Sequence, residues 1–168
     1  MSEMPSLPAK KFNRWLYLPG VFVLVGVVGF TMFYKKGTAL ALQPSDRELV
    51  VLGQTVYQQS CASCHGNNLE GQANWKKRNS DGLLPAPPHD KSGHTWHHAD
   101  ELLFKMTKFG PASLIGGDYK TDMPGFGDSL SDRKIIAVLS YIKSRWPVEV
   151  QQSHDQINLA YKQRNPAN

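Results

Sequence analysis

Five consecutive residues constrain the fold of this chain more than any other segment: Cys61-Ala62-Ser63-Cys64-His65. If the segment ends a helix, its cysteines and histidine stand at positions i, i+3 and i+4 and point to one face. Two thiols and an imidazole placed in this way can form two thioethers to one porphyrin edge and bind the iron. Because this spacing is the attachment signature of a c-type haem, it predicts one covalently attached haem c at Cys61 and Cys64, with His65 as an iron ligand.

Two other kinds of site use closely spaced cysteines, a redox dithiol and a zinc centre. A redox dithiol of the thioredoxin type requires strands that alternate with helices, a pattern that we do not find here. A zinc centre needs two further ligands, but the chain has no other cysteines. For the same reason no disulfide framework is available, so the fold must depend on its apolar core and on haem.

The net charge of +5 is concentrated near the N-terminus. Residues 1–42 hold five Lys or Arg side chains against one Glu, which leaves a single net positive charge for the rest of the chain. Nucleic-acid binding requires a basic patch on the folded domain. The charge distribution therefore excludes a nucleic-acid partner.

A run of 20 residues without a charge, Trp15 to Tyr34, is the second strong signal. As a helix it would be about 30 Å long, which matches the hydrocarbon thickness of a bilayer. Aromatic residues stand at both ends, and three basic residues precede the run while two follow it, as expected for a cytoplasmic N-terminus. We expect residues 1–14 in the cytoplasm, a transmembrane anchor over 15–34 and a linker over 35–45.

A cleaved signal peptide is the alternative, because Ala39-Leu40-Ala41 resembles a cleavage site. The apolar run is longer than a signal peptide needs, and Lys35-Lys36 separates it from that site, so we favour a retained anchor. Covalent haem attachment of this kind takes place outside the cytoplasm. We therefore expect a single-pass protein of the bacterial inner membrane, with its haem domain in the periplasm.

The rest of the sequence predicts an all-α domain without a repeat or a convincing strand. Three apolar periodicities predict its helices, which run from a Ser-X-X-Glu capping box at Ser45 into the cysteines, from Asp100 to Gly110, and from a cap at Ser131 to Pro147. Loops rich in Gly, Asn and Pro separate these helices, and a further short helix is expected near 155–162.

The iron needs a second axial ligand, and the predicted domain contains two methionines. Met106 falls on the apolar stripe of its helix, which favours a core position. Met123 lies in a polar loop, where Pro124 directs it towards an extended backbone. It follows His65 by 58 residues, enough chain to reach the opposite face of the haem. The sequence favours Met123 as the ligand; the alternative is a loop methionine that covers the haem edge.

Three groups of residues together resemble a class I cytochrome c over residues 46–147, with 148–168 as a C-terminal extension. They are Gly53-X-X-X-Tyr57 before the haem motif, Met123-Pro124-Gly125-Phe126-Gly127, and Leu139-X-Tyr141-Ile142 with Trp146. The resemblance implies three main helices around the haem, preceded here by the transmembrane helix. It also implies that Gly53 and Tyr57 meet Leu139 and Tyr141 where the first and last helices cross. A proline-containing loop should supply a carbonyl to His65, with Pro87 as the first choice and Pro85 as the second.

With its N-terminal span, the chain further resembles the membrane-tethered bacterial cytochromes c of the cytochrome c-y type. That resemblance implies an electron-transfer protein rather than an enzyme, with His/Met-ligated iron and no small-molecule substrate. Its partners would be membrane-bound complexes, a cytochrome bc complex and a terminal oxidase or a photosynthetic reaction centre. The alternatives are a fixed haem subunit of a dehydrogenase or oxidase complex and an enzyme whose Met123 is displaced.

Four histidines lie in the loop before Asp100, at positions 89, 94, 97 and 98. They could hold a second metal such as copper or zinc, or one of them could replace Met123 as the iron ligand. They lack a firm ligand spacing, however, which favours a polar loop. The basic run from Trp75 to Arg78 could be a partner-docking patch, although a solvated face is the commoner role of such a run.

Overall fold

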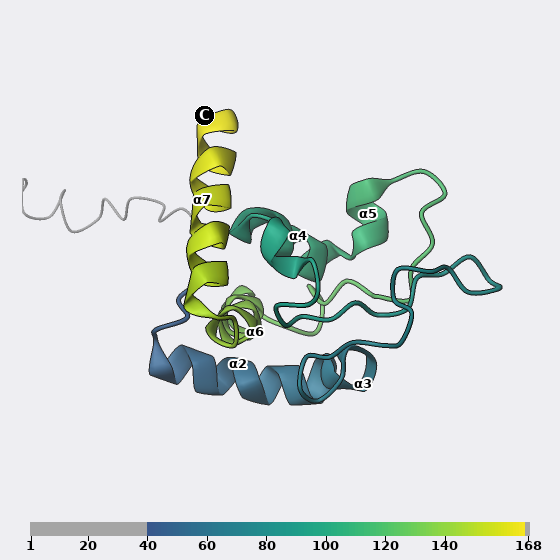
Figure 1. Cartoon of the computed structure of the whole chain (residues 1–168), viewed down its shortest axis with the longest axis horizontal. Helices are drawn as coiled ribbons and strands as arrows, with labels where there is room; N and C mark the ends of the chain where they lie inside the picture. Colours follow the sequence, from purple (N-terminus) through teal and green to yellow (C-terminus); the bar gives the residue numbers. More distant parts are fainter. Residues whose placement is uncertain (1–39, 167–168) are drawn as a thin grey trace, which may run out of the picture. The chain divides into compact units, whose positions relative to one another are not determined.

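The computed structural model describes residues 40–166 of the chain. The predicted cytoplasmic segment and transmembrane anchor, and residues 35–39 of the linker, lie outside the described residues. Within residues 40–166, no helix has the length and apolarity that a membrane crossing requires. This part of the chain consists of helices and loops and contains no strand (Figure 1), which agrees with the all-α prediction.

Six α-helices and one 3-10 turn follow one another in the described residues. They are α2 (Arg47–Ser60), α3 (Ala62–His65), η2 (Thr95–His97), α4 (Asp100–Phe109), α5 (Pro111–Ile115), α6 (Asp132–Ser144) and α7 (Val148–Arg164). The three predicted main helices correspond to α2, α4 and α6. The short helices α3 and α5 were not foreseen as separate elements.

The two predicted N-terminal caps have different outcomes. The capping box at Ser45 is wrong, because the Asp46 side chain caps α2 and accepts a hydrogen bond from Leu49 N at 3.0 Å. A turn closed by Asp46 N and Gln43 O places Ser45 one residue too early to cap the helix. The cap of α6 is confirmed, since Ser131 Oγ accepts a hydrogen bond from Lys134 N.

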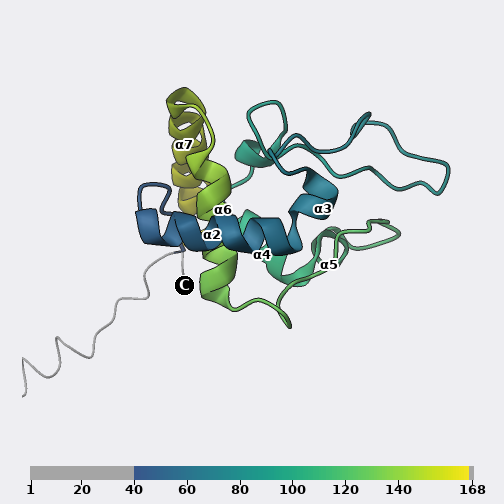
Figure 2. The ribbon, with the colours of Figure 1, turned by 90° about the horizontal axis from the view of Figure 1, so that it is seen from below.

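Helices α2 and α6 cross each other at the centre of the domain (Figure 2). A Cβ atom at Gly53 would lie 2.0 Å from Ala137 O, so the backbones approach too closely for a side chain at this position. Beside the crossing, the rings of Tyr57 and Tyr141 lie 5.6 Å apart. The implied contact of Gly53 and Tyr57 with the last helix is confirmed. Around it lie the buried side chains Val56, Ile135, Val138, Leu139, Ile142 and Trp146.

The C-terminal segment forms one helix, α7, which is much longer than the short helix predicted near 155–162. Pro147 stands at its N-cap, so the residue expected to stop the preceding helix also begins the next one. Helix α7 packs through His154, which is fully buried and lies edge-on to Trp146 with ring centroids 5.1 Å apart. The described end of the chain is therefore part of the same packed domain.

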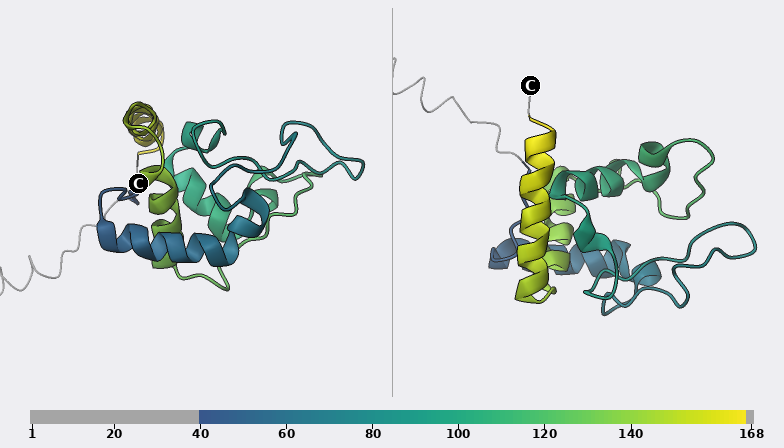
Figure 3. Two further views of the ribbon diagram at one scale, coloured as in Figure 1. Left: turned by 60° about the horizontal axis from the view of Figure 1, so that its bottom comes forward. Right: turned by 45° about the horizontal axis from the view of Figure 1, so that its top comes forward.

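A long loop connects α3 to η2 and extends away from the helices in both views of Figure 3. Its two arms meet where Gln72 N donates to Ala86 O at 2.9 Å. Its tip is closed by Asn79, whose side-chain oxygen accepts hydrogen bonds from the N–H groups of Asp81 and Leu83. The arm that returns from this tip brings Pro87 back to the end of α3.

Candidate functional site

The two cysteines and the histidine of the opening motif lie where α2 gives way to α3. Cys61 ends α2 with φ −121°, so the motif occupies its own short helix rather than a continuation of α2. Its helical spacing is kept, because the N–H groups of Cys64 and His65 both donate to Cys61 O. Both thiols are free, Cys61 half-buried and Cys64 exposed. Burial, together with Cys64, raises the pKa of the Cys61 thiol to about 11.

The buried His65 ring is oriented by one backbone carbonyl. His65 Nδ1 lies 2.8 Å from Pro87 O, and because a carbonyl only accepts, Nδ1 must carry the proton. Nε2 of the neutral ring then holds a free lone pair. Burial lowers the pKa of His65, while the bond to Pro87 opposes that shift. Pro87, the first choice from sequence, is confirmed as the residue whose carbonyl accepts from His65 Nδ1–H, and Pro85 is not used.

The carbonyl of Pro87 belongs to a backbone segment that is packed too tightly to move freely. We call residues 85–89 the proline segment. A Cβ atom at Gly71 would lie 2.4 Å from Pro88 N, and one at Gly93 would lie 1.9 Å from Pro88 O. These two glycines let neighbouring backbone close around the segment, so the position of the carbonyl is set by the fold.

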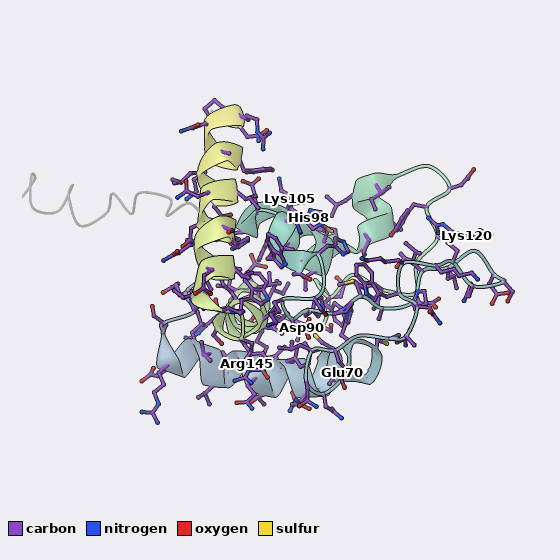
Figure 4. The ribbon with its side chains drawn as sticks, viewed as in Figure 1. Glu70, Asp90, His98, Lys105, Lys120 and Arg145 are labelled. Atoms are coloured by element: carbon purple, nitrogen blue, oxygen red, sulfur yellow. The ribbon has the colours of Figure 1, made fainter. Side chains whose placement is uncertain are left out.

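Tyr57 supports the turn that follows the motif. Its hydroxyl donates to Gly66 O at 2.9 Å and lies 3.3 Å from His65 O. Burial raises the pKa of Tyr57 above its ordinary value, so the hydroxyl keeps its proton. Outside this turn Glu70 lies beside α3 (Figure 4), and its carboxylate accepts the N–H of Asn68 at 2.7 Å. The backbone after His65 is thus held by the buried Tyr57 hydroxyl on one side and by the exposed Glu70 carboxylate on the other.

His89 is a residue of the site that the sequence did not reveal as such. Its ring stacks on that of His65, with centroids 4.0 Å apart and planes inclined by 25°. Burial and the neighbouring His65 and His94 hold the pKa of His89 well below its ordinary value. In the sequence it was only one of four loop histidines, because no periodicity links position 89 to position 65.

Met123, the ligand predicted from sequence, lies in the segment between α5 and α6, and its side chain is half-buried. Its N–H donates to Thr121 Oγ1 at 3.1 Å. The residues after it are held on the end of α4, since Phe126 N donates to Thr107 O and Gly127 N donates to Lys108 O, both at 2.9 Å. The competing methionine, Met106 on α4, is also half-buried rather than a fully buried core residue.

The remaining loop histidines have aromatic neighbours. His94 stacks on Trp75 with centroids 5.3 Å apart, and His97 stacks on Trp96 at 3.7 Å. Across residues 40–166, no three His, Cys, Asp or Glu side chains gather closely enough to hold a metal ion. A second metal in this loop therefore gains no support from the geometry.

The family described as "Cytochrome c" matches residues 50–146, which is more than half of the chain. The chain belongs to the cytochrome c family. The matched residues begin in α2, end just after α6, and include both cysteines, His65 and Met123. They lie within the predicted haem domain of 46–147. No curated protein and no solved structure matches the chain.

Membership of the cytochrome c family implies covalently bound haem c, and the residues at the end of α2 fit that group. Two free thiols lie at the helical spacing needed for two thioethers. Beside them, the tautomer imposed by Pro87 leaves a histidine lone pair uncommitted. A zinc centre would need more ligands than the histidine and the thiols, and across residues 40–166 no three His, Cys, Asp or Glu side chains gather closely enough to hold one.

Proposed function

We propose that this cytochrome c is a membrane-anchored monohaem protein that transfers single electrons on the extracytoplasmic face of the membrane. The observation that carries the proposal is the 2.8 Å hydrogen bond between His65 Nδ1 and Pro87 O. Metal-binding histidines commonly use their second nitrogen in this way, which fixes the tautomer and raises the basicity of the ligating nitrogen.

In this proposal four side chains hold the group. Cys61 and Cys64 would form the thioethers, and His65 Nε2 and the Met123 thioether would bind the iron. Haem c, when bound, supplies a one-electron iron couple. The thioether of Met123 favours the reduced state and so raises the reduction potential. With His65 and Met123 both bound to it, the iron would have no place left for oxygen or for a substrate.

An electron carrier differs from a haem enzyme in that protein side chains occupy both axial positions of its iron. Members of this family are generally electron carriers. Carbon monoxide provides the test, because it binds reduced iron only where an axial position is open or easily opened. The reduced full-length protein should not bind carbon monoxide, whereas the Met123→Ala variant should. Ready binding by the unaltered protein would contradict the carrier proposal and favour an enzyme.

The proposals of a membrane anchor and of particular partners are based on the sequence. The apolar run over 15–34 supports a single span in the bacterial inner membrane, with the haem domain in the periplasm. The partners would be a cytochrome bc complex and a terminal oxidase or a photosynthetic reaction centre. N-terminal sequencing of the mature protein tests the anchor, since a start at Leu42 would mean that the segment is removed.

One observation favours a second candidate, a fixed haem subunit of a dehydrogenase or terminal oxidase complex. Leu42 N donates to Asp100 Oδ2 at 2.9 Å and Gln43 N donates to Ser140 Oγ at 3.0 Å, so the chain is held on the domain from Leu42 onward. The free tether after Lys35 then shrinks to residues 36–41, which span about 20 Å when fully extended. Such a short tether restricts a carrier to partners close by in the same membrane.

Extraction of the membrane in mild detergent distinguishes these two functions. A carrier should be isolated as a free haem protein, without a fixed partner. A stable complex of defined stoichiometry would identify a subunit instead. The absorbance of the haem locates the protein in either fraction, so both outcomes can be read from one gel-filtration run.

A further inference from the structure

His89 is held in place through its backbone and its side chain. Its N–H donates to Leu69 O at 2.8 Å, and its carbonyl accepts a hydrogen bond from Trp146 Nε1 at 2.7 Å. Its ring nitrogen Nδ1 lies 2.9 Å from Thr95 Oγ1. These three contacts come from three different parts of the chain, so neither the backbone nor the ring of His89 can turn without breaking one of them.

The ring held in this way covers one face of the His65 imidazole. The two rings lie nearly parallel with centroids 4.0 Å apart, which is close to van der Waals contact for stacked rings. The edge of Tyr57 approaches His89 from another side, with centroids 6.3 Å apart and planes at 75°. A flat neighbour at this distance allows His65 to keep its plane but obstructs rotation about the Cβ–Cγ bond.

The stack also covers the hydrogen bond that orients His65. The atom that donates to Pro87 O belongs to the covered ring, and Pro87 lies two residues before His89 on the same proline segment. The carbonyl of Pro87 and the covering ring of His89 are therefore held by the same short stretch of backbone. Since a hydrogen bond is electrostatically stronger where water is excluded, the cover strengthens the bond as well as orienting it.

Thr95 explains why the covering ring is an imidazole rather than an aliphatic side chain. The Thr95 hydroxyl is directed at Pro88 O at 3.5 Å, which leaves its oxygen free to accept from His89 Nδ1–H at 2.9 Å. This pair of contacts fixes the ring within its own plane. A leucine would fill similar space but would present no flat face and no donor to Thr95.

We propose that His89 is a positioning residue for His65: its stacked ring fixes the plane of the imidazole and keeps water from the bond between His65 Nδ1 and Pro87 O. The inference rests on the proposed function, since it takes His65 as an iron ligand. It assigns His89 no contact with iron and no role in partner binding.

The test uses the full-length haem protein in its reduced, diamagnetic state and measures the exchange of the His65 Nδ1 proton with solvent by NMR. His89→Leu should accelerate this exchange about tenfold, because local opening is no longer opposed by the stack. His89→Phe keeps a flat ring and should restore a rate close to that of the unaltered protein. The matched control is His97→Leu, which removes an exposed histidine that stacks on Trp96 and should leave the rate unchanged.

A backbone amide within α6, that of Tyr141, reports global stability in the same spectra and should exchange equally slowly in all variants. An unchanged His65 rate in His89→Leu would overturn the inference, and so would equal acceleration in the Leu and Phe variants. If His89→Leu cannot be obtained with haem, His89→Met, which likewise presents no flat ring, decides in its place. It should also accelerate the exchange, and an unaltered rate would overturn the inference.

Failure of the proposed function is visible before any variant is compared. If His65 binds the iron, the ring current of the haem must shift the NMR signals of the His65 ring protons away from their usual chemical shifts. If the chemical shifts of these protons were those of an ordinary histidine, His65 would not be the ligand, and the inference would be overturned with it. Shifted His65 signals together with an unchanged exchange rate in His89→Leu would overturn the inference alone.

Discussion

Two backbone carbonyls after the cysteine motif accept hydrogen bonds from side chains. Pro87 O accepts from the His65 ring, and Gly66 O accepts from the Tyr57 hydroxyl. Gly66 O has one further donor, Leu69 N at 3.4 Å, so the bond from the Tyr57 hydroxyl is the shorter of its two. At the scale of single residues, the geometry of the site should be sensitive to these side chains.

Replacement of the Tyr57 hydroxyl tests this dependence. Tyr57→Phe should lower the free energy of unfolding of the haem protein by about 1–3 kcal/mol, since Gly66 O loses the shorter of its two hydrogen bonds. Chemical denaturation followed by haem absorbance measures the change. Tyr161→Phe, which alters a half-buried tyrosine on α7, is the matched control and should be close to neutral. Equal stability of the two variants would show that the Tyr57 bond contributes nothing.

The sequence was sufficient for those residues of the site that a spacing defines. Cys61, Cys64 and His65 follow from the motif, and the resemblance to class I cytochromes c was enough to choose Pro87. His89 was missed because its stack depends on how the proline segment folds back over α3. Asp46 and Ser45 are adjacent residues that can both cap a helix, so only the preceding turn decides between them.

At the scale of helices, the crossing of α2 and α6 is the least tolerant contact. Gly53→Ala should cost about 1–3 kcal/mol or more of stability, because the new Cβ would lie 2.0 Å from Ala137 O and force the helices apart. Alanine is the better helix former, so a loss cannot come from helix propensity. Gln54→Ala, an exposed position on the same helix, should be neutral. Thermal denaturation of both variants decides, and a stable Gly53→Ala protein would refute the close crossing.

Helix α7 is attached largely through polar contacts. His154 Nε2 lies 2.9 Å from His98 O and 3.5 Å from Asp100 Oδ1. Asn158 exchanges hydrogen bonds with Asp100, and Lys143 of α6 pairs with Asp155. Figure 4 shows His98 near the start of α4, so these contacts join α7 to α4 as well as to α6. His154, Asp100 and Lys143 are buried, and the attachment should therefore respond to the ionisation of His154.

The ionisation of His154 gives a prediction with a definite sign. Burial and the charge of Lys143 lower the pKa of His154, although Asp100, His98 O and Asp155 oppose the shift. Below pH 6.5, the ordinary pKa of a histidine, His154 binds a proton in the unfolded chain more readily than in the folded protein. Stability therefore falls as pH falls. His154→Gln should weaken the loss of melting temperature between about pH 7.5 and about pH 5.5. His97→Gln, at an exposed position, should not, and an unchanged slope in His154→Gln would contradict the assignment.

The helices that the sequence predicted well are those with an apolar stripe and a cap, α2, α4 and α6. Helix α7 was predicted only in part, because Pro147 suggests a stop and His154 is its only fully buried residue. A helix that packs through histidine, asparagine and an ion pair leaves no hydrophobic periodicity to read. Its extent is decided by partners on α4 and α6 that are distant in sequence.

At the scale of the whole molecule, the proposed anchor should be separable from the haem domain. We expect that replacing residues 1–36 with a cleavable signal peptide releases a haem protein with an unaltered spectrum into the soluble periplasmic fraction, since an apolar span of about 20 residues is what retains it. Cell fractionation followed by haem staining measures the distribution. Continued retention in washed membranes would show that residues 37–168 bind the membrane or a membrane partner by themselves.

In the proposed function, His65 and Met123 would both bind the iron of a single haem. The most direct test is the sulfur-to-iron absorption band of the oxidised full-length protein, compared in Met123→Leu and in its matched control Met106→Leu. The band should be present in the unaltered protein and in Met106→Leu, and absent from Met123→Leu, whose reduction potential should also fall. A band that survives in Met123→Leu and disappears in Met106→Leu would contradict the assignment.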